Sequence, residues 1–485
     1  MRHTLRRSCA TCAKSKLGCD LATPRCSRCA RRGIPCIYAN QPLTAKPSHQ
    51  PTKGSPGALT SYNPSSLDPF DSYPRTRLSR DHVQRLIHSF INKIAFEYYP
   101  LDLNAASNPF LISWWPLALG DPALFHVTLQ TACLDEELIA QKGFATSHLL
   151  MADSVALLRR KVEDTALAVQ DGTMNSVITL ATIEFGKGNT ELAEMHVEGV
   201  KKLVDLRGGI NAVRQTSPLT ARMVSWVSLI ITGSPQFQTQ DNVGIGDGIP
   251  PVPEWQLGLT LYDDLSEILD CFEIDSAVLN VFIRLRNILQ RAQQSPLPST
   301  HLHDLTCFVV HRLLHTATDP EDSPTSPTTE CLRYAIALFL FTAQGPTYYS
   351  HAVIFSMLAS RFTNHLKRLS STPRAYGSLA IWLHGVGMVA AAGTNSYEWL
   401  IEKTWETTQL LHVADGEEAM ARLKTILWVD TPHAEALFRS HWDGVFERAG
   451  SCRKSNVPAA TTTMVSSFPA PALAPTGSVL GLQSE

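Results

Sequence analysis

The chain has 485 residues, which is long enough for a small module plus one large domain or two medium ones, and its composition of 44% hydrophobic and 18% charged residues is typical of a globular protein. The composition argues against a membrane protein, because no stretch approaches the roughly 18 apolar residues of a membrane span. The net charge of −2 is unevenly divided: residues 1–40 carry +8 and the remainder −10, which predicts a basic segment that binds a polyanion and an acidic body that does not.

The basic segment holds six of the eleven cysteines, spaced C-x2-C-x6-C-x6-C-x2-C-x6-C. The last three cysteines repeat the first three after 17 residues, which predicts two equivalent halves, each with a CxxC turn that opens a short helix. Structural zinc takes four ligands, so two ions need eight ligand positions, and six thiolates supply eight only if two equivalent ones bridge. The predicted ligands are Cys9, Cys12, Cys19, Cys26, Cys29 and Cys36.

Three alternatives for these cysteines explain less. A disulfide framework needs a secretory context, and the N-terminus has positive charge but no apolar run behind it. A single four-cysteine zinc site would leave two thiols unused. Iron–sulfur ligation fits the spacing but leaves the many lysines and arginines unexplained. We therefore predict two Zn²⁺ ions, whose binding is coupled to folding because about 30 residues bury too little apolar surface to fold alone.

Residues 8–38 resemble the fungal Zn2Cys6 DNA-binding domain along their whole length, including Pro24 and the Gly33-Ile34-Pro35 turn. The resemblance implies that Cys9 and Cys26 bridge: one zinc would bind the first four cysteines, and the other would bind the last three together with Cys9. It also implies a nuclear, sequence-specific DNA-binding transcription factor for RNA polymerase II genes. Its partners would be double-stranded DNA and the transcription machinery, and it would not be an enzyme.

In this family the end of the first short helix enters the major groove, and a basic residue there contacts a CGG-like triplet. Lys16 occupies that position, and lysine can donate to O6 and N7 of guanine. Ser15 and Gly18 stand where basic residues are common, and the pattern resembles the subgroup that contains the aflatoxin-pathway regulator. A TCG-like half-site and a role in a secondary-metabolite gene cluster are therefore also implied. Predicted phosphate contacts are Lys14, Arg6, Arg7, Arg28, Arg31 and Arg32.

The cluster module is assigned to residues 1–40. Residues 41–78 are rich in proline, serine and threonine and are predicted to form a tether without a packed core. No apolar heptad occurs between Tyr38 and Ser79, so a coiled-coil dimer is not predicted; a monomer on DNA and a homodimer formed through the large domain both stay open. The last segment, 451–485, is nearly uncharged and predicted to be disordered.

From residue 79 to 450 the periodicity is helical, beginning with an apolar stripe behind a Ser79 cap, and the predicted fold is all-α. Residues 174–210 resemble the regulatory domain of fungal Zn2Cys6 factors. Further helices are predicted near 123–140, 146–168, 173–186, 190–206, 218–232, 276–294, 302–316, 330–343, 350–370, 376–392, 396–412, 417–428 and 431–448.

No catalytic constellation is predicted in this region. Gly244, Gly246 and Gly248 fit a loop better than a phosphate cradle, because Pro250-Pro251 follows where a helix would begin. His311 and His315 are predicted to be a surface pair, and 319–329 an exposed loop. The cysteines outside the cluster are expected to be buried or idle thiols. Two other functions stay open: a metabolite sensor acting through the helical domain, and a protein-interaction adaptor with weak DNA binding.

Overall fold

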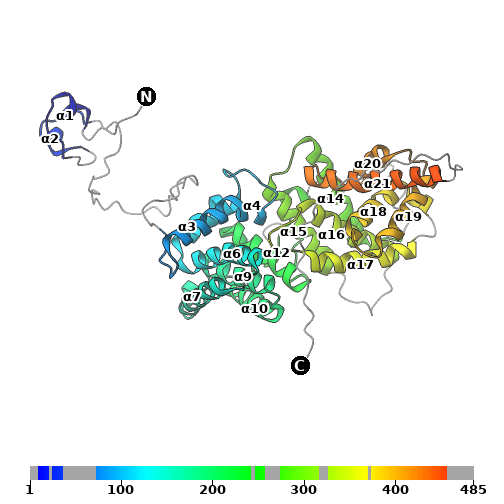
Figure 1. Cartoon of the computed structure of the whole chain (residues 1–485), viewed down its shortest axis with the longest axis horizontal. Coiled ribbons are helices and arrows are strands. Elements are labelled where there is room, and N and C mark those ends of the chain that lie inside the picture. The colour runs from blue at the N-terminus through cyan, green and yellow to red at the C-terminus, as the bar shows by residue number, and fades with distance from the viewer. Residues whose placement is uncertain are drawn as a thin grey trace, which may run out of the picture. The chain divides into compact units, whose positions relative to one another are not determined.

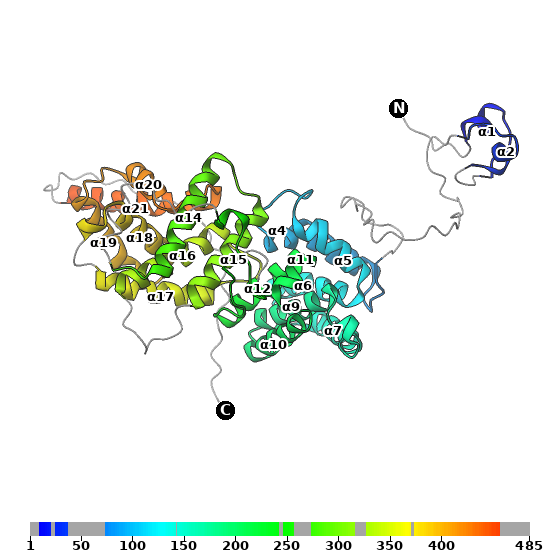
Figure 2. The ribbon, with the colours of Figure 1, turned by 180° about the vertical axis from the view of Figure 1, so that it is seen from behind.

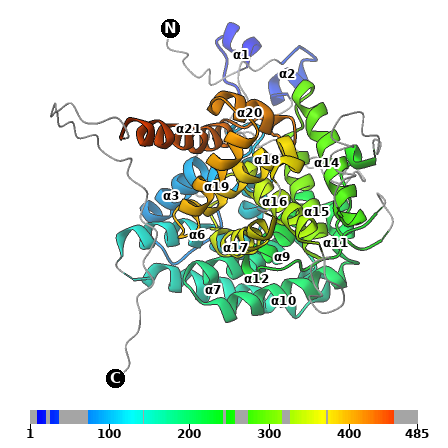
Figure 3. The same cartoon turned by 90° about the vertical axis from the view of Figure 1, so that its right-hand side faces the viewer.

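A computed structural model describes residues 9–20, 25–36, 73–141, 143–241, 246–256, 273–315, 326–369 and 373–455. The chain divides into two compact units, Met1–Ser61 and Tyr62–Glu485. In the first unit the described segments hold two short helices, α1 (Ala10–Lys14) and α2 (Ser27–Arg31). The second unit is a body of helices, shown from three directions in Figures 1, 2 and 3.

The all-α prediction is confirmed for the second unit. In its described part the only β-type pairing is one isolated bridge between Thr239 and Ile249. The helices up to residue 232 form its N-terminal half: α3 (Arg80–Ser89), η1 (Phe90–Ile94), α4 (Ala95–Tyr98), η2 (Phe110–Trp114), α5 (Trp115–Gly120), α6 (Pro122–Ala140), α7 (Ala145–Val162), α8 (Thr165–Ala168), α9 (Asp171–Gly186), α10 (Thr190–Leu206), α11 (Ile210–Thr216) and α12 (Pro218–Thr232).

The C-terminal half of the body follows a loop and the short helix η3 (Pro253–Gln256). Among the described residues its helices are α14 (Ser276–Gln294), α15 (Ser299–His315), α16 (Pro327–Gln344), α17 (Ala352–Leu369), α18 (Pro373–Ala391), α19 (Tyr397–Leu410), α20 (Gly416–Lys424) and α21 (Pro432–Ser455).

The N-terminal half is organised around α6 and α9, which pack on each other and on α7, α10 and α12. Helix α6 begins sharply because Asp121 accepts hydrogen bonds from the backbone N–H groups of Ala123 (3.0 Å) and Leu124 (3.3 Å), with Pro122 at the first helical position. Most residues in the first three turns of α6 are buried. The half therefore has a central pair of helices of which most residues are buried.

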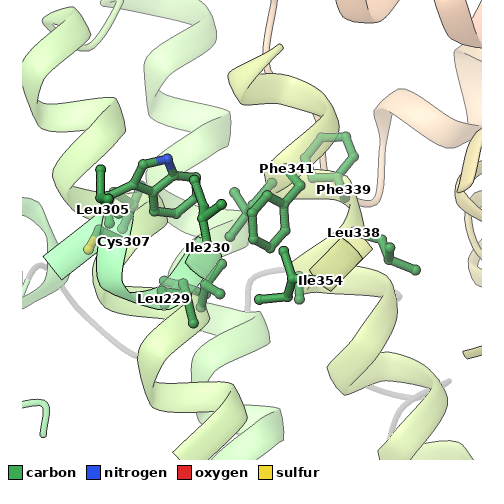
Figure 4. Packing of buried hydrophobic residues seen from close by; sticks show 14 of the residues in the cluster. Leu229, Ile230, Leu305, Cys307, Leu338, Phe339, Phe341 and Ile354 are labelled. Atoms are coloured by element: carbon green, nitrogen blue, oxygen red, sulfur yellow. The ribbon is translucent and has the colours of Figure 1, made fainter. Parts of the chain in front are cut away.

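Helix α16 is the centre of the C-terminal half, packed against α14, α15, α17 and α18 (Figure 3). All its residues from Thr328 to Gln344 are buried. Figure 4 shows Phe341 of α16 beside Ile230 of α12 and Ile354 of α17. The core thus continues from one half of the body into the other, as a single cluster of buried side chains.

Polar contacts also join the two halves along the line where α12 meets α15. Asp304 on α15 is 3% exposed and bonded by two arginines of the N-terminal half, Arg222 (2.8 Å) and Arg214 (3.0 Å). At another point of contact between the halves, the backbone N–H of Tyr348, which follows α16, donates to the carbonyl of Glu97 on α4 (2.8 Å). These bonds fix the register of one half against the other, because a buried carboxylate without its partners would be costly.

The structure corrects several helix ends. Helix α7 ends at Val162 instead of continuing to 168, because Asp164 leaves the helix and caps α8. Helix α20 ends at Lys424, four residues before the predicted end at residue 428. Helix α16 begins at Pro327, behind the Ser326 cap, so residues 327–329 are not an exposed loop and Thr329 is buried; residues 316–325 lie outside the described part.

Two boundaries of the body also differ from expectation. The end of the predicted tether packs on the body: Tyr73 stacks on Phe125 with ring centroids 5.7 Å apart, and Arg77 pairs with Asp153 (2.7 Å). Residues 41–72 lie outside the described residues. Helix α21 runs to Ser455, five residues into the predicted disordered tail; residues 456–485 are not described.

The histidine pair was predicted wrongly. His311 is fully buried in α15, where its Nδ1 lies 2.8 Å from the carbonyl oxygen of Cys307, and His315 Nε2 lies 2.7 Å from the carbonyl oxygen of Phe237. Core packing of α15 overrides the surface placement that i, i+4 spacing allowed. Cys133, Cys307 and Cys331 are buried free thiols, as expected. Gly246 and Gly248 lie in a loop, and Gly244 is outside the described residues.

Candidate zinc centre and nucleic-acid interface

The two halves of the cysteine motif fold in the same way. Cys9 and Cys26 are the N-caps of α1 and α2, both in extended backbone conformation. Each cap sulfur accepts a hydrogen bond from a backbone N–H three residues later, Cys12 to Cys9 and Cys29 to Cys26, both 3.4 Å long. These bonds satisfy N–H groups that a helix start leaves unpaired. The predicted helix after each CxxC turn is therefore present.

The six sulfurs lie in two overlapping groups. Cys9, Cys12, Cys19 and Cys26 form one group and Cys9, Cys26, Cys29 and Cys36 the other, with the sulfurs of each group all within 4.8 Å of one another. The sulfurs of Cys9 and Cys26 are 3.9 Å apart, and those of Cys12 and Cys26 are 3.7 Å apart. A zinc ion with four sulfurs at about 2.3 Å separates neighbouring sulfurs by about 3.8 Å. The donor set and its spacing therefore fit two zinc ions that share two cysteines.

The electrostatics of this cluster favour bound cations. Burial, followed by the neighbouring sulfurs of Cys9 and Cys26, raises the pKa of Cys12 to about 12. Burial also raises the pKa of Cys9. Crowded thiolates are therefore unfavourable without positive charge among them, and metal cations at the centre of each group remove that penalty.

Backbone donors support the outer sulfurs. The N–H of Cys9 donates to the sulfur of Cys19 (3.5 Å), and that of Cys26 donates to the sulfur of Cys36 (3.3 Å). Because these residues are again 17 positions apart, the pseudo-twofold symmetry extends to the hydrogen bonds around the sulfurs. Such bonds orient metal ligands and reduce the charge that the sulfurs carry.

Both short helices end in a left-handed turn, but with different residues. Gly33 has φ +62°, and the N–H of Ile34 donates to the carbonyl of Cys29 (3.2 Å). At the equivalent place Lys16 has φ +50°, and the N–H of Leu17 donates to the carbonyl of Cys12 (3.0 Å). Glycine is the ordinary residue for this conformation, and a side chain there is strained by roughly 1 kcal/mol. Lysine thus replaces glycine in the half that was predicted to read DNA.

In addition to the shared sulfurs, two hydrogen-bonded contacts join the two halves of the zinc module. The Thr11 hydroxyl donates to the carbonyl of Pro35 (2.6 Å), which joins α1 to the end of the second half. The carboxylate of Asp20, the one acid of this segment, accepts from the N–H of Ser27 at the start of α2 (3.1 Å). Neither role was predicted, since Thr11 and Pro35 are 24 residues apart and Asp20 lies seven residues before Ser27.

The basic residues form an exposed surface around this centre. Lys14, Ser15 and Lys16 are exposed at the end of α1, followed by the exposed Leu17 and Gly18. On α2 and its end, Arg31 and Arg32 are exposed and Arg28 is half-buried. Arg6 and Arg7 lie outside the described residues. The predicted base-reading and phosphate-contacting groups that are described are thus all accessible to a ligand in solution.

Comparison with known families identifies two domains. Residues 7–45 match the fungal Zn(2)-Cys(6) binuclear cluster domain, and residues 85–234 match the fungal specific transcription factor domain. The chain therefore contains a zinc-cluster domain, which binds two zinc ions, followed by the helical domain of fungal transcription factors. The second match covers almost the whole N-terminal half of the body and includes the segment 174–210 that resembled it.

Similar proteins are fungal transcription regulators, two of which are named for gene clusters. The chain is 40% identical over 72 residues to the ergochrome gene cluster transcriptional regulator of Claviceps purpurea, covering 14% of each protein. It is 36% identical over 70 residues to the transcription activator ACTTR of Alternaria alternata, 14% of this chain and 16% of that protein. It is 28% identical over 165 residues to the geodin cluster transcription factor of Aspergillus terreus, 32% of this chain and 70% of that protein.

The chain thus matches only about a seventh of the length of the ergochrome regulator. No solved structure matches the chain. Within the described residues, none of the helices combines the length and apolar character that crossing a membrane requires.

Proposed function

We propose that this protein is a zinc-dependent, sequence-specific DNA-binding transcription factor of RNA polymerase II genes, and that it regulates a fungal secondary-metabolite gene cluster. The observation that carries the proposal is the pair of overlapping four-sulfur groups with exposed lysines at the end of α1. The names of the similar proteins support the assignment to a gene cluster. The protein acts in the nucleus and has no catalytic role.

The ligands of the two zinc ions are the six cysteines of residues 9–36, with Cys9 and Cys26 bridging. This assignment is supported by the sulfur groups, which share those two residues. The zinc pair provides the interior that the module lacks, since apart from the cysteines Ile34 alone among the described apolar residues packs against the sulfurs. Removing zinc therefore unfolds the module and abolishes DNA binding.

In the DNA complex, α1 enters the major groove and Lys16 donates to a guanine of a CGG-like or TCG-like half-site. Ser15 and Lys14 lie beside it. Lys14, Arg28, Arg31, Arg32 and the N-terminal Arg6 and Arg7 contact phosphates, which set affinity and register. The proposed domains are a DNA-binding module at 1–40, a linker from 41, a helical regulatory domain that includes Tyr73 and extends to Ser455, and a tail after it.

Metal analysis of the purified full-length chain tests the zinc centre together with its function. We expect two zinc ions per chain, and loss of both zinc and duplex DNA binding on chelation or in Cys26→Ser. Cys331→Ala, which changes a buried thiol in the helical body, is the matched control and should keep both ions and DNA binding. One zinc per chain, or DNA binding that survives chelation, would overturn the proposal.

A further inference from the structure

The turns that end the two short helices of the zinc module share a backbone but differ in their side chains. The 17-residue repeat sets Lys16-Leu17-Gly18 against Gly33-Ile34-Pro35. In both turns the N–H of the middle residue donates to the carbonyl of the second cysteine of its CxxC pair, at 3.0 Å in the first half and 3.2 Å in the second. The side chains of the two turns can therefore be compared in the same backbone setting.

In the second half this turn helps to close the zinc module. Ile34 is half-buried, and its side chain packs against the sulfurs. The carbonyl of the next residue, Pro35, accepts the hydrogen bond from Thr11 of the other half (2.6 Å). The apolar side chain at this place of the repeat therefore belongs to the interior of the module.

In the first half the equivalent leucine is open to solvent. Leu17 is 39% exposed and is not among the apolar residues that pack against the sulfurs. A Cβ atom added to the next residue, Gly18, would meet no other atom within 4 Å, so packing does not require a glycine there. The glycine leaves the space beside Leu17 open. Among the described residues of the zinc module, Leu17 is the only large apolar side chain that is exposed.

Leu17 belongs to the surface that is proposed to enter the major groove. Its neighbour Lys16 is the proposed base-reading residue, and Lys14 and Ser15 before it are exposed as well. Consecutive Cα atoms are about 3.8 Å apart and consecutive base pairs about 3.4 Å apart along the duplex, so neighbouring residues of one turn reach neighbouring base pairs. When Lys16 contacts a base, Leu17 therefore lies close to the edge of the next one.

The major groove offers an apolar side chain one kind of target. The edges of guanine, cytosine and adenine present hydrogen-bond donors and acceptors there, whereas thymine also presents its C5 methyl group. Contact between a leucine and this methyl group removes apolar surface of both from water, which is favourable. A leucine held at a base edge therefore favours thymine.

We propose that Leu17 is a specificity-determining residue, whose side chain lies against the methyl group of a thymine in the base pair next to the one that Lys16 contacts. The inference rests on the proposed function, because it requires α1 in the major groove. Lys16 then reads a guanine by hydrogen bonds, and Leu17 reads a thymine by apolar contact. Ile34 makes no such contact, since its side chain packs on the sulfurs.

Uracil in place of thymine tests the proposal, because it removes the methyl group and leaves the base pairing unchanged. The zinc-loaded full-length chain first selects its preferred duplex from random DNA. Each thymine in the selected triplet or in an adjoining base pair is then replaced in turn by deoxyuridine. We expect one replacement to weaken binding about fourfold, the effect of one buried methyl group. Leu17→Ala should bind this thymine duplex more weakly than the unchanged chain does, and should bind the thymine and uracil duplexes equally.

Ile34→Val is the matched control, because it shortens the apolar side chain at the equivalent place of the second half. It should keep the difference between thymine and uracil, and metal analysis checks that both variants hold two zinc ions. A selected site without such a thymine, binding that no replacement weakens, or a difference that Leu17→Ala keeps would overturn this inference and leave the proposed function standing. Failure to select any sequence would overturn both.

Discussion

At the scale of single residues, Lys16 combines two unusual properties. It is exposed at the end of α1, and it adopts the left-handed conformation that glycine adopts in the other half. Strain of this kind persists where the surrounding structure fixes the backbone, and it is frequent at functional sites. Here the sulfurs and the bond from Leu17 to Cys12 fix the turn, so the lysine is held at a defined place beyond the helix end.

Replacing Lys16 separates base reading from general attraction to DNA. We expect Lys16→Ala to weaken binding to the selected half-site by about tenfold to a hundredfold and binding to random duplex much less, since a good base contact contributes about 1–3 kcal/mol of discrimination. Arg31→Ala is the control: it should weaken both DNAs alike and lower the salt slope by about 1. Competition binding at two salt concentrations measures both effects, and equal losses in Lys16→Ala would assign the lysine to the phosphates.

The glycine substitution tests the strain itself. Lys16→Gly removes both the amine and the strained side chain, so the zinc module should become more stable by roughly 1 kcal/mol while specific DNA binding is lost. Gly33→Ala makes the opposite change in the second half and should destabilise the module by a similar amount. The rate of zinc transfer to a coloured chelator measures the stability of the zinc module in both variants. Faster transfer from Lys16→Gly than from the unchanged chain would contradict this account.

The sequence allowed the zinc centre to be predicted in outline but not this turn. The 17-residue repeat and ligand arithmetic indicated two overlapping groups, because metal coordination allows few solutions. The backbone of Lys16 was not predicted, since no glycine marks a left-handed residue there. The buried place of His311 was missed for another reason: i, i+4 spacing is the same on the buried and the exposed face of a helix.

At the scale of helices, the contact between α12 and α15 holds the two halves of the body together. Helix positions in the chain could be predicted, because apolar periodicity and caps such as Asp121 are local signals. The contact between α12 and α15 could not be predicted, since Asp304 is 90 residues from Arg214 and 82 residues from Arg222 in the sequence.

Substitution of Asp304 measures the strength of this contact. Asp304→Ala leaves two partly buried arginines without their carboxylate and should destabilise the body by about 3 kcal/mol, as is usual when one partner of a buried pair is removed. Asp153→Ala removes the partner of Arg77, which is 56% exposed, and should destabilise the body much less than Asp304→Ala, because solvent screens an exposed ion pair. Urea unfolding followed by circular dichroism compares them; similar losses would mean that the buried pair adds nothing.

At the scale of the whole molecule, buried histidines make the stability of the body depend on pH. Burial lowers the pKa of His303, His311 and His384 to about 4, below the ordinary value of 6.5. The unfolded chain therefore binds protons that the folded chain does not between these values, and stability present above pH 6.5 is lost as the pH falls toward 4. Each histidine contributes a slope of about 1.4 kcal/mol per pH unit within that window.

Urea unfolding of the full chain from pH 7.5 to 5 tests this dependence. The midpoint should change little above pH 7 and fall steadily below 6.5. His384→Gln removes one of these histidines, whose ring nitrogens lie 3.3 Å from the hydroxyls of Thr404 and Thr407, and should reduce the slope by that histidine's share. A midpoint that stays constant between pH 6.5 and 5 would contradict the proposed neutral state of these side chains.

The central claim is that α1 reads a DNA sequence only when zinc is bound. Selection from a pool of random duplex DNA with the zinc-loaded full-length chain measures this directly and also gives the spacing of half-sites. We predict enrichment of a CGG-like or TCG-like triplet, which disappears in Cys26→Ser and changes in Lys16→Ala. Retention of DNA without any enriched sequence, or the same enriched sequence from Cys26→Ser, would contradict the central claim.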